Sequence, residues 1–165
     1  MQKNAKNITY GAIIAALYVA LSHGQNMLFP GSASMAIQFR ASEALCVLAF
    51  FTPSAIWGLT LGCLLFNLTS GAALPLDFLV GSLASCLAAL GIWKTRNRIP
   101  FLGLMMPALT NGLLVGWELS VYIGGGFWLN AVYVAIGEVA VMMTLGLALY
   151  FALKKNRLYS RIFRS

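Results

Sequence analysis

The chain has 165 residues, of which 60% are hydrophobic and 9% are charged, and its formal net charge is +7. An ordinary soluble domain carries roughly 25% charged residues, so this composition excludes a water-soluble globular domain as the main body of the protein. One membrane crossing needs about 20 apolar residues, so the length allows at most six or seven short crossings within a single transmembrane domain over residues 1–165.

Positive charge is concentrated in three clusters that flank apolar segments, and only Arg40 lies elsewhere. The clusters are Lys3 with Lys6, then Lys94, Arg96 and Arg98, then Lys154, Lys155, Arg157, Arg161 and Arg164. This pattern is typical of membrane topology rather than of nucleic-acid binding. We therefore expect a lipid bilayer, and no nucleic acid, around this protein.

Six apolar segments predict an all-α integral membrane protein with six transmembrane helices. In chain order, the predicted helices span residues 8–23, 41–52, 55–69, 76–93, 101–122 and 127–153, with an external loop at residues 24–40.

The first predicted helix carries alanines at four-residue spacing, namely Ala12, Ala16 and Ala20, with Gly11 and Ala15 on the adjoining row. Small residues at this spacing let another helix approach closely. The row either packs inside the protein or docks onto a partner subunit, and the spacing alone leaves both interpretations open.

The second and third segments are either two helices or one helix kinked at Pro53. A hairpin at this proline places all three basic clusters on the cytoplasmic side, which the positive-inside rule favours, and makes both termini cytoplasmic. The segment 41–52 would measure about 18 Å as a helix, which is shorter than the roughly 30 Å hydrocarbon core. We therefore expect part of this region to be re-entrant or submerged.

All four acidic residues lie within or at the ends of predicted crossings, where an ionised side chain costs several kcal/mol unless it is paired or hydrated. They are Glu43, Asp77, Glu118 and Glu138. Glu43 and Asp77 also suit the starts of helices. Glu138 lies about 16 Å along the last helix, near the midplane of the membrane. These acids are the first candidates for a functional site.

Other polar and aromatic residues gather in the outer half of the last two helices. Asn111 and Glu118 are seven residues apart and therefore share one helix face. Asn130 and Trp128 mark the outer end of the last helix, and Trp117 lies at the outer end of the helix before it. The aromatic residues indicate either an interfacial belt or a ligand cage. Together these residues predict a pocket that opens to the exterior.

The sequence contains no GxxxxGK[ST], HExxH or GxSxG motif. His23 is the only histidine, and three cysteines are far apart in the sequence. We therefore expect no catalytic residue, no metal site and no cofactor. ATP-driven transport would require an ATPase on another subunit.

Three sequence segments resemble the QueT family of queuosine-precursor transporters. They are QFRASEAL at 38–45 with Phe51-Thr52-Pro53, NGLLVGWEL at 111–119, and FWLNAVYVAIGE at 127–138. The resemblance implies the bundle of a substrate-binding S component of an energy-coupling factor (ECF) importer, located in the bacterial plasma membrane. It also implies a transmembrane coupling subunit and two ATPase subunits as partners, with Ala12, Ala16 and Ala20 similar to the docking motif.

The ligand implied by the resemblance is a 7-deazaguanine such as preQ1, captured outside the cell. Its ring offers two N–H donors beside an O6 acceptor, and one carboxylate can accept both donors. Glu138 or Glu118 fits this role, and a second carboxylate, from these two, Glu43 or Asp77, would suit the aminomethyl cation. Donors to O6 would come from Asn111, Asn130, Gln38 or Arg40, and Trp117 or Trp128 could stack on the ring.

Three other functions stay open at this point. The chain could be a proton-coupled secondary transporter that uses Glu138 as its relay, although no repeat relates its two halves. It could be an S component for another vitamin. An intramembrane enzyme with paired carboxylates is the third, but no nucleophile and base pair is evident.

Overall fold

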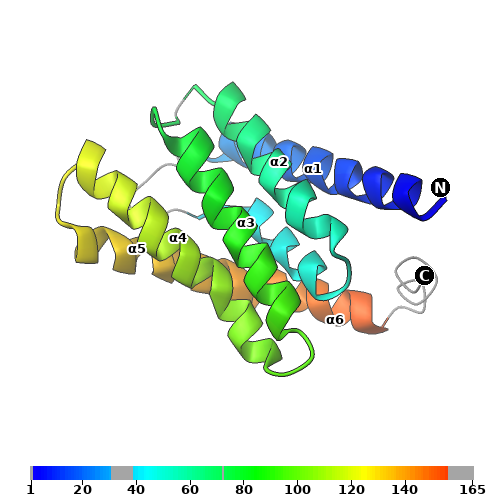
Figure 1. The fold of residues 1–165 in the computed structure, drawn as a ribbon. Helices are drawn as coiled ribbons and strands as arrows, with labels where there is room; N and C mark the ends of the chain where they lie inside the picture. The colour runs from blue at the N-terminus through cyan, green and yellow to red at the C-terminus, as the bar shows by residue number, and fades with distance from the viewer. Residues whose placement is uncertain (1, 31–38, 72, 156–165) are drawn as a thin grey trace.

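The computed structural model describes residues 2–30, 39–71 and 73–155. Over these ranges every element of regular secondary structure is a helix, which confirms the all-α expectation. The first two α-helices run in the same direction, and each of the next three runs opposite to the one before it (Figure 1). The elements are α1 (Gln2–Leu28), η1 (Ala41–Phe50), α2 (Ser54–Thr69), α3 (Asp77–Thr95), α4 (Pro100–Tyr122), α5 (Phe127–Val141), η2 (Met142–Gly146) and α6 (Leu147–Lys155).

Four helical segments in the described part of the chain are long and apolar enough to cross a membrane. They are Ala5–Leu28, Asp77–Thr95, Pro100–Tyr122 and Phe127–Lys155, the last of which joins α5, η2 and α6. The remaining apolar helices, η1 and α2, are shorter. A count of six crossings with both termini in the cytoplasm therefore stays a prediction.

The first helix is longer at both ends than the apolar segment 8–23. Polar residues before Ile8 continue the helix because helical backbone needs no apolar side chains outside the bilayer. At the other end, α1 runs through Leu28 because no proline interrupts it before Pro30. Residues 24–28, expected in the external loop, are thus helical, and residues 31–38 of that loop lie outside the described residues.

The segment η1 is a 3-10 helix enclosed by the rest of the bundle, and its residues from Ser42 to Phe50 are all buried. A 3-10 helix rises about 2 Å per residue, so η1 is too short to cross a bilayer alone. Helical hydrogen bonding that departs from the α pattern is tolerated at membrane depth when the backbone is buried in protein. This arrangement fits the expectation of a submerged segment.

Glycines bring α1 and α2 into close contact. A Cβ atom at Gly58 would lie 2.7 Å from the carbonyl oxygen of Gly11, and one at Gly62 would lie 3.1 Å from Cα of Ala15. The row of Gly11 and Ala15 is therefore used for packing inside the protein. The adjoining row faces outward, since its members Ala12, Ala16 and Ala20 are all exposed.

The helices α4 and α5 form a tight hairpin. A Cβ atom at Gly116 would lie 2.6 Å from Cα of Ala131, so the two backbones touch there. The connecting turn has positive φ at Gly124, Gly125 and Gly126, a conformation that glycine adopts without strain. This hairpin places the polar residues of α4 directly opposite those of α5.

The basic segments of α1, the α3 to α4 connection and the end of α6 lie toward the same end of the bundle (Figure 1). The connection between α4 and α5 lies at the opposite end. This distribution is the one expected if these three basic segments lie on a single, cytoplasmic side of the membrane.

Candidate ligand-binding site

Polar side chains converge in the interior of the bundle at a depth where an unpartnered polar atom is costly. Each of the helices α1 to α5, together with η1, contributes at least one of these side chains. The buried members are Tyr18 and Ser22 from α1, Arg40 at the start of η1, Ser42 and Glu43 from η1, Asn67 from α2, Asp77 and Ser85 from α3, Asn111 and Glu118 from α4, and Glu138 from α5.

Glu43 is held by donors from three elements. The hydroxyl of Tyr18 donates to Oε1 of Glu43 over 2.5 Å, and the thiol of Cys46 donates to Oε2 over 3.2 Å. The hydroxyl of Ser85 donates to Oε1 over 3.5 Å. Both carboxylate oxygens of Glu43 therefore have protein partners, and this residue fastens η1 between α1 and α3.

Glu138 has a partner for only one of its two oxygens. The side-chain amide of Asn111 donates to Oε1 of Glu138 over 3.0 Å. The other oxygen, Oε2, is buried and has no hydrogen-bond partner. The pair thus offers one acceptor at Oε2 and the second N–H of the Asn111 amide.

Asp77 likewise has a hydrogen-bond partner for only one of its two carboxylate oxygens. The backbone N–H of Leu74 donates to Oδ2 of Asp77 over 2.8 Å, and Oδ1 is buried without a partner. The amide of Asn67 donates to the Asp77 carbonyl oxygen over 2.7 Å. This bond directs the amide oxygen of Asn67 away from the carbonyl, and that oxygen is also buried and unpartnered.

Glu118 is fully buried, and neither of its carboxylate oxygens has a hydrogen-bond partner. Its carboxyl group interacts electrostatically with that of Asp77. Leaving buried polar atoms without partners costs free energy of about 1–3 kcal/mol each, and more for charged groups. A site that binds a ligand with N–H donors would recover this cost.

Arg40 supplies the buried positive charge of the cluster. Its Nη1 lies 4.0 Å from Sγ of Cys63, and its guanidinium lies 5.9 Å from the ring centre of Phe66. The field of the guanidinium acts on all four acids, namely Glu43, Asp77, Glu118 and Glu138. The structure therefore brings six sequence candidates together: Arg40, Glu43, Asp77, Asn111, Glu118 and Glu138.

Other sequence candidates lie apart from this cluster. The amide of Asn130 donates to the carbonyl oxygen of Gly124 over 2.7 Å and so caps the glycine turn. Trp117 is 49% exposed and Trp128 is 73% exposed, so both indoles lie on the outer surface of the bundle. Gln38 lies outside the described residues.

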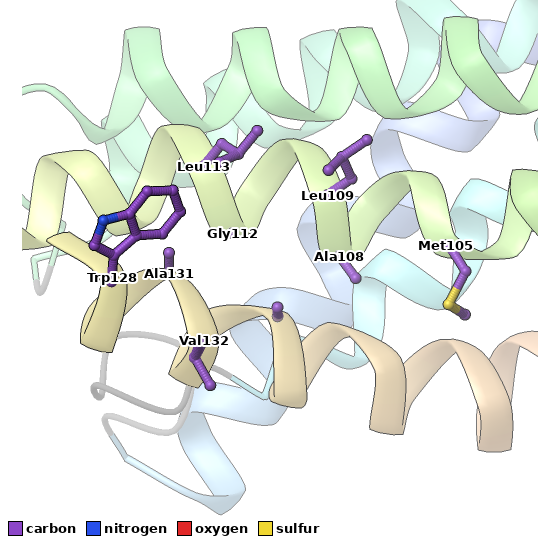
Figure 2. A pocket seen from close by; sticks show the side chains of 9 residues that line it. Met105, Ala108, Leu109, Gly112, Leu113, Trp128, Ala131 and Val132 are labelled. Carbon is purple, nitrogen blue, oxygen red and sulfur yellow. The ribbon is translucent and has the colours of Figure 1, made fainter.

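An apolar groove of about 340 Å³ runs between α4 and α5, with Trp128 at one end and Met105 near the other (Figure 2). None of the buried acids lines it. A ligand site needs a few placed polar groups for orientation, and this groove offers only the Trp128 indole N–H. The buried polar cluster, rather than the groove, is therefore the candidate site for a polar ligand.

Sequence reasoning missed five members of the cluster, namely Tyr18, Ser22, Ser42, Asn67 and Ser85. The sequence could have identified them, because each is a polar side chain within or at the end of an apolar helix. Among the described residues, no three His, Cys, Asp or Glu side chains are grouped so that they could hold a metal ion. The chemistry of the cluster is hydrogen bonding and charge.

The family model of the QueT transporter matches residues 8–155 of this chain. No curated protein and no solved structure matches it.

Proposed function

This chain belongs to the QueT transporter family and is a multi-pass membrane protein, and we propose that it is the substrate-binding S component of an ECF importer. Its ligand is a queuosine precursor, a 7-deazaguanine such as preQ1, which it captures outside the cell. A transmembrane coupling subunit and two ATPase subunits then drive delivery into the cytoplasm.

The observation that carries this proposal is the pair of Asn111 and Glu138. A guanine-type edge presents an O6 acceptor next to the N1–H and 2-amino donors. The free N–H of Asn111 suits O6, and the unpartnered Oε2 of Glu138 suits the neighbouring ring N–H. This donor and acceptor order matches the edge of a 7-deazaguanine.

Support for a partner subunit comes from the outward row of Ala12, Ala16 and Ala20 on α1. Its neighbouring row is already occupied by α2, so the outward alanines have no packing role with α2. A row of small residues that faces lipid leaves room for the close approach of a helix from another chain. We assign this row to the coupling subunit.

The decisive experiment measures binding and transport separately. The purified chain in detergent should bind preQ1 without any partner, and cells or vesicles that contain the chain alone should show no uptake. Uptake should appear when the coupling subunit and ATPases are added and ATP is present. Failure of the solitary protein to bind any 7-deazaguanine would contradict the proposal.

A proton-coupled secondary transporter is the second candidate, because the carboxyl groups of Glu43 and Glu138 interact electrostatically and could relay a proton. That function predicts uptake by vesicles that contain only this chain when a proton gradient is applied without ATP. The same vesicle preparation therefore distinguishes the two functions.

A further inference from the structure

The buried cluster has an excess of hydrogen-bond acceptors. The unpartnered buried atoms in it are Oδ1 of Asn67, Oδ1 of Asp77, both carboxylate oxygens of Glu118 and Oε2 of Glu138. Every one of these atoms is an oxygen that accepts hydrogen bonds when the acids are ionised. A ligand that satisfies them must therefore be rich in donors.

The acceptors divide into two groups along α4. Asn111, which holds Glu138, and Glu118 are seven residues apart, or about 10 Å along the helix axis. Glu118 is close to the end of α4 at Tyr122, while Asn111 lies deeper. The Asn111 and Glu138 pair forms one end of the cluster, and the Asp77 and Glu118 pair forms the other.

The Asp77 and Glu118 pair has the chemistry of a cation site. It presents three unpartnered oxygens, one from Asp77 and two from Glu118, and a primary ammonium group has three N–H donors. Packing places the two acids near each other, because Ala84 of α3 and Leu74, whose N–H binds Asp77, both pack against Val115 and Leu119, the neighbours of Glu118 on α4. A group with fewer donors at this position would leave some of these buried oxygens unpartnered.

Charge balance leads to the same conclusion. Among the described residues, four buried acids face one buried guanidinium, that of Arg40, whose field they share. Glu43 is already served by three protein donors, and Glu138 receives an N–H from Asn111. The Asp77 and Glu118 pair therefore keeps three unpartnered oxygens, whereas the Asn111 and Glu138 pair keeps one.

We propose that Asp77 and Glu118 form a subsite for a primary ammonium group, so that this chain prefers the aminomethyl precursor to neutral 7-deazaguanines. This inference rests on the proposed function and assigns a separate role to each carboxylate. The ring edge lies at Asn111 and Glu138, and the ammonium group lies between Asp77 and Glu118. Glu43 connects η1 to α1 and α3 and does not contact the ligand.

The test uses three 7-deazaguanines that share one ring and differ only at position 7, bound to the purified full chain in detergent. One carries an aminomethyl group, one a neutral hydroxymethyl group of similar size, and one a nitrile. Hydrogen bonds to charged groups are stronger than neutral ones, so the amine should bind roughly tenfold or more tightly than either neutral ligand.

Two variants test whether the preference for the amine arises at Asp77 and Glu118. Glu118→Gln and Asp77→Asn should each weaken binding of the amine by roughly tenfold or more and leave binding of the hydroxymethyl ligand within about threefold. Asparagine at 77 keeps an oxygen for the N–H of Leu74, which preserves the local turn. Glu138→Gln is the matched control and should weaken all three ligands alike. Melting temperatures of the same preparations identify any variant that has not folded.

Equal affinity of the unmodified protein for the amine and the hydroxymethyl ligand would overturn the inference. It would mean that the two carboxyl groups balance their charge by sharing a proton. Equal losses for both ligands in Glu118→Gln would also overturn it. In either case binding of 7-deazaguanines would still support the proposed function, whereas a folded protein that binds none of the three would contradict both.

Discussion

The side chains of Asn111 and Glu138 are 27 residues apart in the sequence and are joined by a 3.0 Å hydrogen bond from the amide to Oε1. The contact ties α4 to α5 beyond the glycine turn that connects them. It also fixes the orientation of the Glu138 carboxylate, because the bonded oxygen faces Asn111 and Oε2 is left as a free acceptor. A preorganised acceptor loses little conformational freedom when a ligand binds.

Substitution of Glu138 by glutamine should weaken preQ1 binding by at least about tenfold without preventing folding. The glutamine oxygen can still accept from Asn111, but its amide then replaces Oε2, so an N–H of the protein faces an N–H of the ligand. The expected cost is about 1–3 kcal/mol, or roughly ten- to hundredfold in affinity. Isothermal titration measures the affinity, and thermal unfolding of the same sample measures stability.

The same chemical change at Glu43 is the control for this prediction. Glu43→Gln should lower the melting temperature and leave the affinity of the folded protein nearly unchanged, because both oxygens of Glu43 are engaged by the protein. A Glu138→Gln variant with normal affinity and a reduced melting temperature would instead assign Glu138 to helix bridging.

Removal of the Tyr18 hydroxyl should destabilise the protein by about 1–3 kcal/mol, since Oε1 of Glu43 loses its shortest donor inside a buried environment. Tyr18→Phe is therefore expected to unfold at a lower temperature in detergent. Tyr122→Phe is the matched control, because Tyr122 is 42% exposed, and it should unfold like the unmodified protein. Equal stability of both variants would show that the Tyr18 contact contributes nothing.

Enlargement of the outward alanine row should separate transport from binding. Ala16→Trp is expected to abolish ATP-driven uptake and to retain preQ1 binding by the solitary chain, since a close helix contact tolerates little added volume. Ala148→Trp on α6 makes the same change at another exposed alanine and should retain both activities. Parallel loss of binding and uptake in Ala16→Trp would indicate that the row packs inside the protein.

The topology can be tested at the connection between α3 and α4. A single cysteine in place of Asn97, in a variant without Cys46, Cys63 and Cys86, should be labelled by a membrane-impermeant maleimide only after the cells are opened. The reason is that Lys94, Arg96 and Arg98 favour the cytoplasmic side. Labelling of Asn97→Cys in intact cells would place this connection outside and contradict the six-crossing arrangement.

The local pattern of the sequence was sufficient to place the helices and to select the four acids. Apolar runs and prolines are local features of the sequence, so most predicted segments lie close to the observed helices. The main differences are that α1 spans Gln2–Leu28, that η1 is a 3-10 helix, and that the last predicted helix contains the π-helical segment η2. The seven-residue spacing of Asn111 and Glu118 likewise placed both on one face of α4, and both are buried.

Only the tertiary structure decided which faces turn inward and which atoms find partners. Lipid and the protein interior are both apolar, so hydropathy does not tell the inward row of Gly11 and Ala15 from the outward row of Ala12 and Ala16. Hydrogen-bond partners depend on how closely separate helices approach. For that reason Glu43 and Glu118 look alike as acids in apolar segments, yet one is satisfied by Tyr18 and the other has two free acceptors in the folded protein.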